Sequence, residues 1–513
     1  MTLNKRVLVS LSIAYLYIPI ILFLFGWTKL WIAVVCILVL GYCICKMQSS
    51  YVRENKEFSE PIKLKISVLI VAIVFFLLIG YFAGWGRWVN QTYDWFKHNA
   101  VLQDLTVKSW PVYYKNDSEH SMLTYYIAQY LVPATFGKIF NSFRIAEIVN
   151  YIWAEIGLIL VWLNLVRLVK INNIFKQILS ALILIFFSCP LWIAQFALNV
   201  LYDINSYSTR WFAVAGDVVL QYSNNFVLLQ WVFPQVIAIW LILLLFIENK
   251  RKTQYYLTLI LPGMLFGTLS FIGIVLIALG CALSELVRIR NIVMWLKKIF
   301  SLENIITLLT LGSVLILYFY GNILCDKPSN ISLKIMEYRD YWGLYFIFIV
   351  TMVIIYSLFI WIDNKKNQLF YFSVISLLLF PLFKMGLWND FVMRASIPAL
   401  FILMYLIIKF LNDNIRIDVF KNANIPVIKK ILPFLICTIL IIGARYPVSD
   451  LNASIEKVNK NLPVDGTNFG TMESFANRNL KETPADLKYN YYSYDIENNL
   501  FYKICSRRNV DGR

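Results

Sequence analysis

Apolar runs of about 20 residues recur along nearly the whole of this 513-residue chain, and polar residues gather in the stretches between them. A helix of that length is about 30 Å long, which is the thickness of the hydrocarbon layer of a bilayer. Only 15% of the residues are charged and 59% are hydrophobic, whereas a soluble protein carries about 25% charged residues. The pattern therefore predicts an all-α polytopic membrane protein.

The apolar runs predict about thirteen transmembrane helices, at residues 7–26, 30–46, 66–84, 147–168, 177–197, 231–248, 255–268, 270–286, 304–321, 342–362, 368–387, 395–411 and 430–445. The pair 255–268 and 270–286 is short for two crossings and is interrupted by Pro262, Gly263, Gly267 and Gly273. Short or broken spans of this kind are typical of helices that line a cavity.

The stretch 121–140 is as apolar as a membrane span, but Pro133 and Gly137 interrupt it and its tyrosines suit the headgroup region. We therefore expect an interfacial or re-entrant helix there. The alternative is a true crossing, which would require a compensating crossing near 211–228 to keep the basic loops on one side.

The net charge of +17 reflects membrane topology rather than a nucleic-acid partner, because the basic residues lie in short loops that we assign to the cytoplasm. These include Lys46, Arg53, Lys250, Arg251, Lys252, Arg288, Arg290, Lys365, Lys366, Lys429 and Lys430. The resulting organisation is a transmembrane domain over 1–446, with a first large external loop at 85–146 carrying interfacial helices. A small, polar external tail follows at 447–513, and we expect it to lean on the external loops.

Candidate chemistry concentrates in the first external loop, which contains both histidines of the chain, His98 and His120. If residues 94–105 form a helix, Asp94 and His98 lie one turn apart on one face. A carboxylate beside an imidazole suits a general base, with Asp104 as a second acid, or part of a divalent-metal site. The alternative is that both residues have purely structural roles, with Asp94 capping the helix and His98 packed against its neighbours.

Aromatic residues in the same loop, Trp95, Trp110 and Tyr113, are natural platforms for a sugar ring, although an ordinary interfacial belt has the same composition. A second cluster, Lys384, Asp390 and Arg394, is predicted at the same face of the membrane. Its cations suit a lipid phosphate, or simply reach for headgroups from the ends of spans. Within the span 147–168, Glu155 is a further candidate, because buried acids in membranes are costly.

This layout resembles the GT-C class of integral membrane glycosyltransferases. The segment "MLTYYIAQYLVPATFGKIFNSFRIAEIVNYIWAEIGLILVWLNLVRLVK" is similar to the stretch that follows the first external loop in bacterial members. In those proteins a Tyr-rich helix ends in Phe-Gly, and an Arg opens the next span. Many members carry two adjacent acids in the loop, whereas Asp94 is followed here by Trp95.

The resemblance implies transfer of a sugar from a polyprenyl-phosphate donor to a surface glycan, lipid or protein at the outer face of the bacterial cytoplasmic membrane. It implies Asp94 as the base, oriented by His98 or Asp104, and Arg394 with Lys384 at the departing phosphate. Asp390, His120 and the three aromatic residues would complete the substrate site. The resemblance leaves open whether the reaction uses a divalent cation, Mg²⁺ or Mn²⁺. The alternatives are a polysaccharide polymerase or ligase, and a flippase or other transporter.

Overall fold

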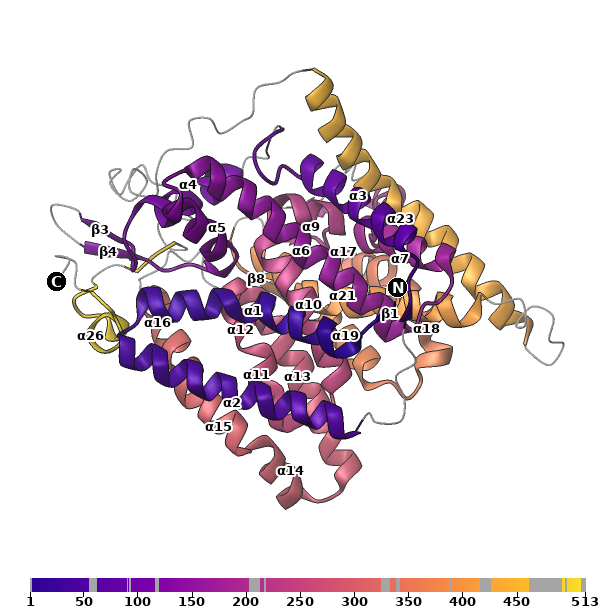
Figure 1. Cartoon of the computed structure of the whole chain (residues 1–513). Helices are drawn as coiled ribbons and strands as arrows, with labels where there is room; N and C mark the ends of the chain where they lie inside the picture. The colour runs from indigo at the N-terminus through magenta and orange to yellow at the C-terminus, as the bar shows by residue number, and fades with distance from the viewer. Residues whose placement is uncertain are drawn as a thin grey trace.

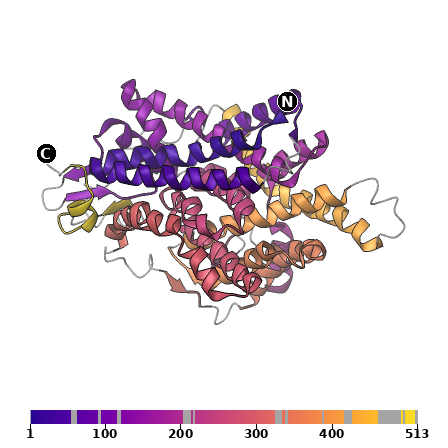
Figure 2. The same ribbon diagram turned by 60° about the horizontal axis from the view of Figure 1, so that its bottom comes forward.

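The structure is a computed structural model, and it describes residues 2–54, 62–89, 91, 94–115, 120–202, 213–215, 218–323, 333–337, 342–386, 389–415, 426–460, 491–493 and 496–508. Most of these residues are helical, and Figure 1 shows the long helices α1 and α2 running side by side. In Figure 2 α1, α2 and most of the other helices coloured indigo to purple lie above most of the pink and orange helices that follow residue 250.

The first half of the chain contains, in order, β1 (Thr2–Leu3), α1 (Lys5–Trp27), α2 (Leu30–Glu54), β2 (Ile62–Lys63), α3 (Ile66–Phe82), α4 (Trp95–Val107), β3 (Tyr113–Lys115), β4 (His120–Leu123), α5 (Ala128–Ile139), α6 (Phe143–Val169), α7 (Ile174–Phe186), α8 (Leu191–Tyr202), β5 (Ala213–Ala215), β6 (Val218–Leu220), α9 (Asn225–Trp231) and α10 (Phe233–Asn249).

The second half contains the short helix η1 (Thr253–Tyr255), α11 (Tyr256–Ile260), α12 (Pro262–Phe266), α13 (Thr268–Ile289), α14 (Ile292–Ile299), α15 (Leu302–Thr307), η2 (Leu308–Gly312), α16 (Ser313–Ile323), β7 (Lys334–Ile335), α17 (Trp342–Ile349), η3 (Val350–Ile354), α18 (Ile355–Asn364), α19 (Gln368–Leu379), η4 (Phe380–Leu382), β8 (Phe383–Lys384), α20 (Asp390–Ala395), α21 (Ile397–Asn414), α23 (Val427–Asn459), β9 (Tyr492–Ser493) and α26 (Leu500–Ile504).

Within the described residues, eight helices are long and apolar enough to cross a membrane, or nine if the bent pair α7 and α8 forms one span. The eight run over Lys5–Trp27, Leu30–Ser50, Phe143–Val169, Thr268–Ile289, Ile292–Asn322, Trp342–Asn364, Asp390–Asn414 and Val427–Asn459. The polytopic helical class is therefore confirmed, whereas the count of thirteen is not. Three further predicted spans coincide with α3, α10 and the segment Gln368–Leu382, which are apolar but shorter.

The predicted span 255–268 is broken, as its proline and glycines indicate. It is divided into α11 and α12, each of five residues, with Pro262 opening the second and Gly267 following its end. Gly263 and Gly273, in contrast, lie inside α12 and α13 and do not interrupt them. Proline lacks a backbone N–H, and at the first position of α12 this costs no helical hydrogen bond.

The stretch 121–140 is also divided, into the end of β4 and the twelve-residue helix α5. At 1.5 Å per residue α5 is about 18 Å long, too short to cross a bilayer. The expectation that Pro133 and Gly137 interrupt the helix is wrong, since both lie inside α5. Gly137 instead permits close packing: a Cβ atom there would stand 2.7 Å from Thr106 of α4 and 2.8 Å from Ala146 of α6.

The core is centred on α10 and α21, whose side chains are buried almost all the way round. A helix that is apolar on every face lies either among other helices or in lipid. The helix α10 lies among other helices, since α6, α12, α13 and α21 all contact it. Several other helices bury one face and leave large apolar side chains exposed on the other, as α2 does with Leu38 and α3 with Ile70. Such exposed apolar faces are what lipid tails would cover.

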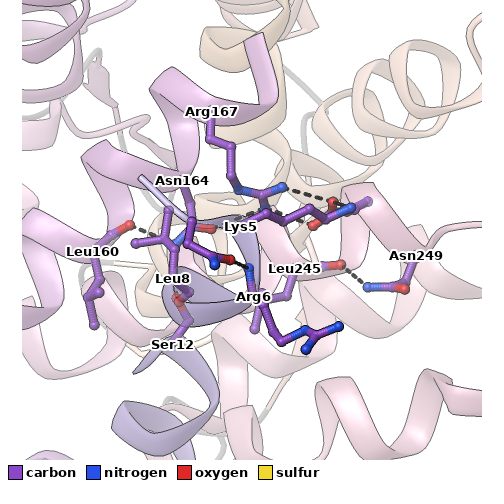
Figure 3. Close-up of polar contacts among 11 residues, drawn as sticks. Lys5, Arg6, Leu8, Ser12, Leu160, Asn164, Arg167, Leu245 and Asn249 are labelled. Carbon is purple, nitrogen blue, oxygen red and sulfur yellow. Dashed lines mark hydrogen bonds and ion pairs between the residues drawn. The ribbon is translucent and has the colours of Figure 1, made fainter. Parts of the chain in front are cut away.

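Charged residues gather at the end of the bundle where α1 begins, which we call the inner end. There Lys5 of α1 and Arg167 of α6 both form ion pairs with Glu248 of α10. Figure 3 shows Lys5 and Arg167 beside one another, with the hydrogen-bonded Asn164 one helical turn away. Side chains from three predicted cytoplasmic loops, among them Arg251, Arg288 and Lys366, also line one cavity.

At the opposite, outer end lie α4, α5, the β3–β4 hairpin and α26 (Figure 1). Residues from the far C-terminus pack here: β9 pairs with β4, and Ser506 bridges to Thr28 at the end of α1. The described part of the tail thus leans on the first external loop. The boundary that we placed at 446/447 lies inside α23, which continues through Pro447 to Asn459.

Candidate functional site

The helix α4 places Asp94 at its N-terminal end and His98 one turn further on, as the sequence predicts for a helix over 94–105. Asp94 occupies the cap position, yet its side chain makes no capping hydrogen bond. Its carboxylate is 29% exposed, and the nearest cation is the ammonium of Lys97, 3.6 Å away. The Asp94 side chain therefore does not cap α4, so the purely structural role that its position allowed is not observed.

His98, in contrast, is 4% exposed and both of its ring nitrogens have protein partners. Nε2 lies 2.9 Å from the carbonyl oxygen of Trp231, and Nδ1 lies 2.5 Å from the hydroxyl of Tyr130. A carbonyl can only accept, so Nε2 carries the proton and Nδ1 accepts from Tyr130. Burial lowers the pKa of His98, which favours this neutral form. In this arrangement the ring supports α4 and has no nitrogen open to a substrate.

Arg394 lies near the outer end of the span 390–414, on the short helix α20. Its Nη2 atom is 3.2 Å from Asp390 Oδ1, so the predicted pair with a spacing of four residues is formed. The guanidinium is only 17% exposed, and its Nε–H group has no hydrogen-bond partner among the described residues. An Arg side chain with a spare, buried N–H donor is suited to an incoming anion.

The loop that leads to Arg394 is held firmly. Asn389 adopts a left-handed conformation with φ of 53°, and its side-chain amide donates to the carbonyl oxygens of Val219 and Phe383. Asparagine tolerates this backbone region better than most residues. Lys384 precedes the loop on β8, pairs across the sheet with Lys334, and is 6% exposed. It is therefore a buried residue rather than one reaching freely for headgroups.

Asp94 and Arg394 are far apart in sequence, but they come within electrostatic range of one another at the outer end. Tyr126, in the turn between β4 and α5, interacts electrostatically with both of them and with Asp390. Burial raises the pKa of Tyr126, so its phenol is un-ionised and can donate a hydrogen bond. We call Asp94, Tyr126, Asp390 and Arg394 the outer cluster. It combines an acid, a cation and a neutral hydroxyl.

Two further tyrosines complete the surroundings of the outer cluster, and the sequence analysis did not single them out. Tyr125 stacks on Tyr491 with ring centroids 4.1 Å apart, and the ring of Tyr126 lies 3.6 Å from that of Tyr125. Tyr491 belongs to the C-terminal segment and lies within electrostatic range of both Asp94 and Arg394. The paired tyrosines at 125–126 and 491–492 were the only sequence signal for this stack.

The predicted sugar platforms do not gather around the outer cluster. Trp95 is 2% exposed; it stacks on Phe233 and donates from Nε1 to the carbonyl oxygen of Gln230. Trp110 donates to the carbonyl oxygen of Leu105 and packs on Trp27. Both rings therefore serve as packing elements that fix α4 against its neighbours.

Tyr113 and His120 face the C-terminal segment instead. The Tyr113 hydroxyl lies 2.5 Å from Ser506 Oγ and donates to the carbonyl oxygen of Arg508, and burial raises the pKa of Tyr113 to about 12. His120 Nδ1 lies 3.7 Å from Glu497 Oε1 at a half-exposed site. These two residues join the hairpin to the tail.

Asp104 is buried at the far end of α4, where its Oδ2 atom accepts a hydrogen bond from Tyr114 at 2.9 Å. Ten residues of helix separate it from Asp94, a rise of about 15 Å. The two carboxylates therefore cannot act on one atom or share one metal ion. Among the described residues, no group of three His, Cys, Asp or Glu side chains is placed to hold a metal.

The outer cluster can accept a proton through Asp94, which is partly exposed, and can hold an anion through Arg394. Comparison of the chain with family models, curated proteins and solved structures gives no significant match.

Proposed function

We propose that this membrane protein is a glycosyltransferase that moves a sugar from a polyprenyl-phosphate donor to a surface glycan, lipid or protein. The reaction takes place at the outer face of the bacterial cytoplasmic membrane. The observation that carries this proposal is the outer cluster, in which a carboxylate that does not cap its helix lies within electrostatic range of a buried guanidinium.

Asp94 acts as the general base. It removes the proton of the acceptor hydroxyl while that oxygen bonds to the anomeric carbon of the sugar, and the bond from that carbon to the phosphate oxygen breaks. A carboxylate is suited to this step when it is partly exposed and its protein partner is weak. The separation of 3.6 Å from Lys97 meets that requirement, because it exceeds hydrogen-bond length.

Arg394 stabilises the lipid phosphate that departs. The leaving group gains negative charge in the transition state, and a preorganised cation with an unused donor stabilises that charge without reorganisation. Asp390 holds one side of the guanidinium and leaves the buried Nε–H for the phosphate. The hydroxyl of Tyr126 lies within electrostatic range of Arg394 and is a further candidate donor, since burial raises its pKa still further above neutral pH.

The test is transfer of label by the purified protein in nanodiscs, from undecaprenyl phosphate carrying a radiolabelled hexose or pentose to a washed envelope fraction. We expect Asp94→Asn to lower the rate by about 100-fold or more, which is the usual contribution of a general base. Glu456→Gln is the matched control, because Glu456 is an exposed acid near the outer end of α23. Wild-type rates in the Asp94→Asn variant would refute the assignment of the base.

A transporter of a lipid-linked glycan is the second candidate, and Glu155 favours it. This residue lies twelve residues into α6, about 18 Å along the helix. It is 2% exposed, and neither carboxyl oxygen has a hydrogen-bond partner among the described residues. Acids at such depth often belong to ion or proton pathways. Under this alternative Glu155→Gln abolishes movement of a fluorescent lipid-linked oligosaccharide between leaflets, and Asp94→Asn does not.

A further inference from the structure

A cavity of about 330 Å³ opens at the inner end of the molecule, far from the outer cluster. It lies where the loop after α10, the end of α13, the turn between α18 and α19, and the end of α21 meet. Five cationic side chains line it, and we call this site the basic pocket: Lys250, Arg251, Arg288, Lys366 and Lys409. Two carboxylates, Glu285 and Asp363, lie in the same wall.

Both carboxylates are already paired with cations, one of which, Arg288, also lines the basic pocket. Glu285 is 2.7 Å from Arg288 and 3.5 Å from Lys298. Asp363 is 3.0 Å from Lys429, and its second oxygen accepts a hydrogen bond from Asn414. The basic pocket therefore keeps a positive surplus that its own acids do not balance.

The surplus is carried by Lys250, Arg251, Lys366 and Lys409, none of which forms an ion pair with another described residue. Lys250 is half-buried, and burial lowers its pKa, an effect that the nearby charges of Arg251 and Lys409 reinforce. Cations that converge on a partly buried cavity repel one another, and an anion between them would relieve that repulsion.

The helix α19 adds to the positive potential. It begins at Gln368, which lines the basic pocket, and the side chain of the preceding Asn367 makes no capping hydrogen bond. The first backbone N–H groups of α19 therefore have no side-chain acceptor, and the positive end of the helix dipole lies at the cavity. The combination of a helix N-terminus that lacks a side-chain cap with several cations is typical of phosphate sites.

The cavity is also at the right depth for a membrane phosphate. Lys250 and Arg251 directly follow the apolar helix α10, and Lys366 follows the span that ends at Asn364. Residues in such positions lie at headgroup level on the side that the positive loops mark as cytoplasmic. Basic pockets between membrane helices on that side are where anionic lipid headgroups bind.

We propose that the basic pocket binds a phosphate group, supplied either by the headgroup of an anionic phospholipid of the inner leaflet or by soluble phosphate. The bound group bridges the loop after α10, the α18–α19 turn and the end of α21, and so stabilises the inner end of the bundle. This site is independent of the outer cluster and of the sugar transfer proposed for it.

The test measures binding to the full-length protein in a neutral detergent, with three probes: short-chain phosphatidylglycerol, short-chain phosphatidylcholine and inorganic phosphate. Lys409→Gln is the diagnostic variant, because Lys409 is exposed and its replacement leaves the core intact. Lys409→Arg keeps the charge. Lys297→Gln is the matched control, since Lys297 is an exposed cation at the same end that does not line the basic pocket.

We expect phosphatidylglycerol to raise the unfolding temperature and phosphatidylcholine not to. Lys409→Gln should weaken phosphatidylglycerol binding by about fivefold, and adding Lys250→Gln by about 25-fold, whereas Lys409→Arg and Lys297→Gln should bind as the wild type. Binding of inorganic phosphate as tight as that of the lipid, with the same dependence on Lys409, would assign the site to soluble phosphate. Equal losses in Lys409→Gln and Lys297→Gln, or no binding of either phosphate probe, would overturn the proposal.

Discussion

The ion-pair cluster at the inner end offers the sharpest test of how this bundle is held together. Glu248 of α10 accepts two hydrogen bonds from Arg167 of α6, at 2.8 and 2.7 Å, and lies 2.6 Å from the ammonium of Lys5 of α1. Side-chain exposure is 8% for Arg167, 12% for Glu248 and 26% for Lys5. One carboxylate thus joins three helices, with one cation buried and the other partly in solvent.

The perturbation is Glu248→Gln, which keeps the shape of the side chain and removes its charge. Breaking a buried ion pair from one side costs about 3–5 kcal/mol, because the remaining charge stays buried without compensation. Here that charge is the guanidinium of Arg167. Lys5→Gln removes only the more exposed partner, and such pairs contribute about 1 kcal/mol or less. The variants should therefore differ by at least about 2 kcal/mol in the free energy of unfolding.

The assay is reversible unfolding of the purified protein in mixed micelles, followed by tryptophan fluorescence. It compares the wild type, the single variants Glu248→Gln, Lys5→Gln and Arg167→Gln, and the double variant Glu248→Gln with Arg167→Gln. The double variant removes both buried charges together, so it should lose less than the sum of the losses of Glu248→Gln and Arg167→Gln. If Glu248→Gln costs no more than Lys5→Gln, the argument that burial sets the strength of this cluster is refuted.

Two other predictions concern pH and packing. The pKa of His98 lies below the usual value of 6.5, so the unfolded chain binds a proton there more readily than the folded chain, and stability should fall as the pH drops below about 6.5. The unfolding temperature should therefore fall less between pH 7.5 and 5 in His98→Gln than in the wild type. An equal fall in the two proteins would contradict the reasoning. Gly157→Ala should cost about 1–3 kcal/mol, because its Cβ atom would stand 2.5 Å from the ring of Tyr15. Gly41→Ala is the control: a Cβ atom at Gly41 meets open space, so this substitution should be neutral or stabilise the protein by about 1 kcal/mol. If Gly157→Ala and Gly41→Ala change the unfolding temperature equally, the steric explanation is excluded.

The candidate site was predictable only in part. The one-turn spacing of Asp94 and His98 and the pairing of Asp390 with Arg394 follow from helix geometry, so local sequence was enough to predict both. Local sequence could not show that His98 turns both nitrogens toward protein atoms, because Trp231 lies more than 130 residues away.

The pattern of apolar runs by itself determined that the chain is a helical membrane protein, where most of its long helices lie and which loops carry positive charge. These properties depend on hydropathy within about 20 residues, which sequence records directly. Tertiary structure alone decided which runs stay short or broken, that Asp94 and Arg394 belong to one cluster with Tyr126, and that four separate segments enclose the basic pocket. Such proximities arise from the packing of helices distant in sequence, and within the bilayer that packing depends on close fit and interhelical hydrogen bonds rather than on hydrophobicity.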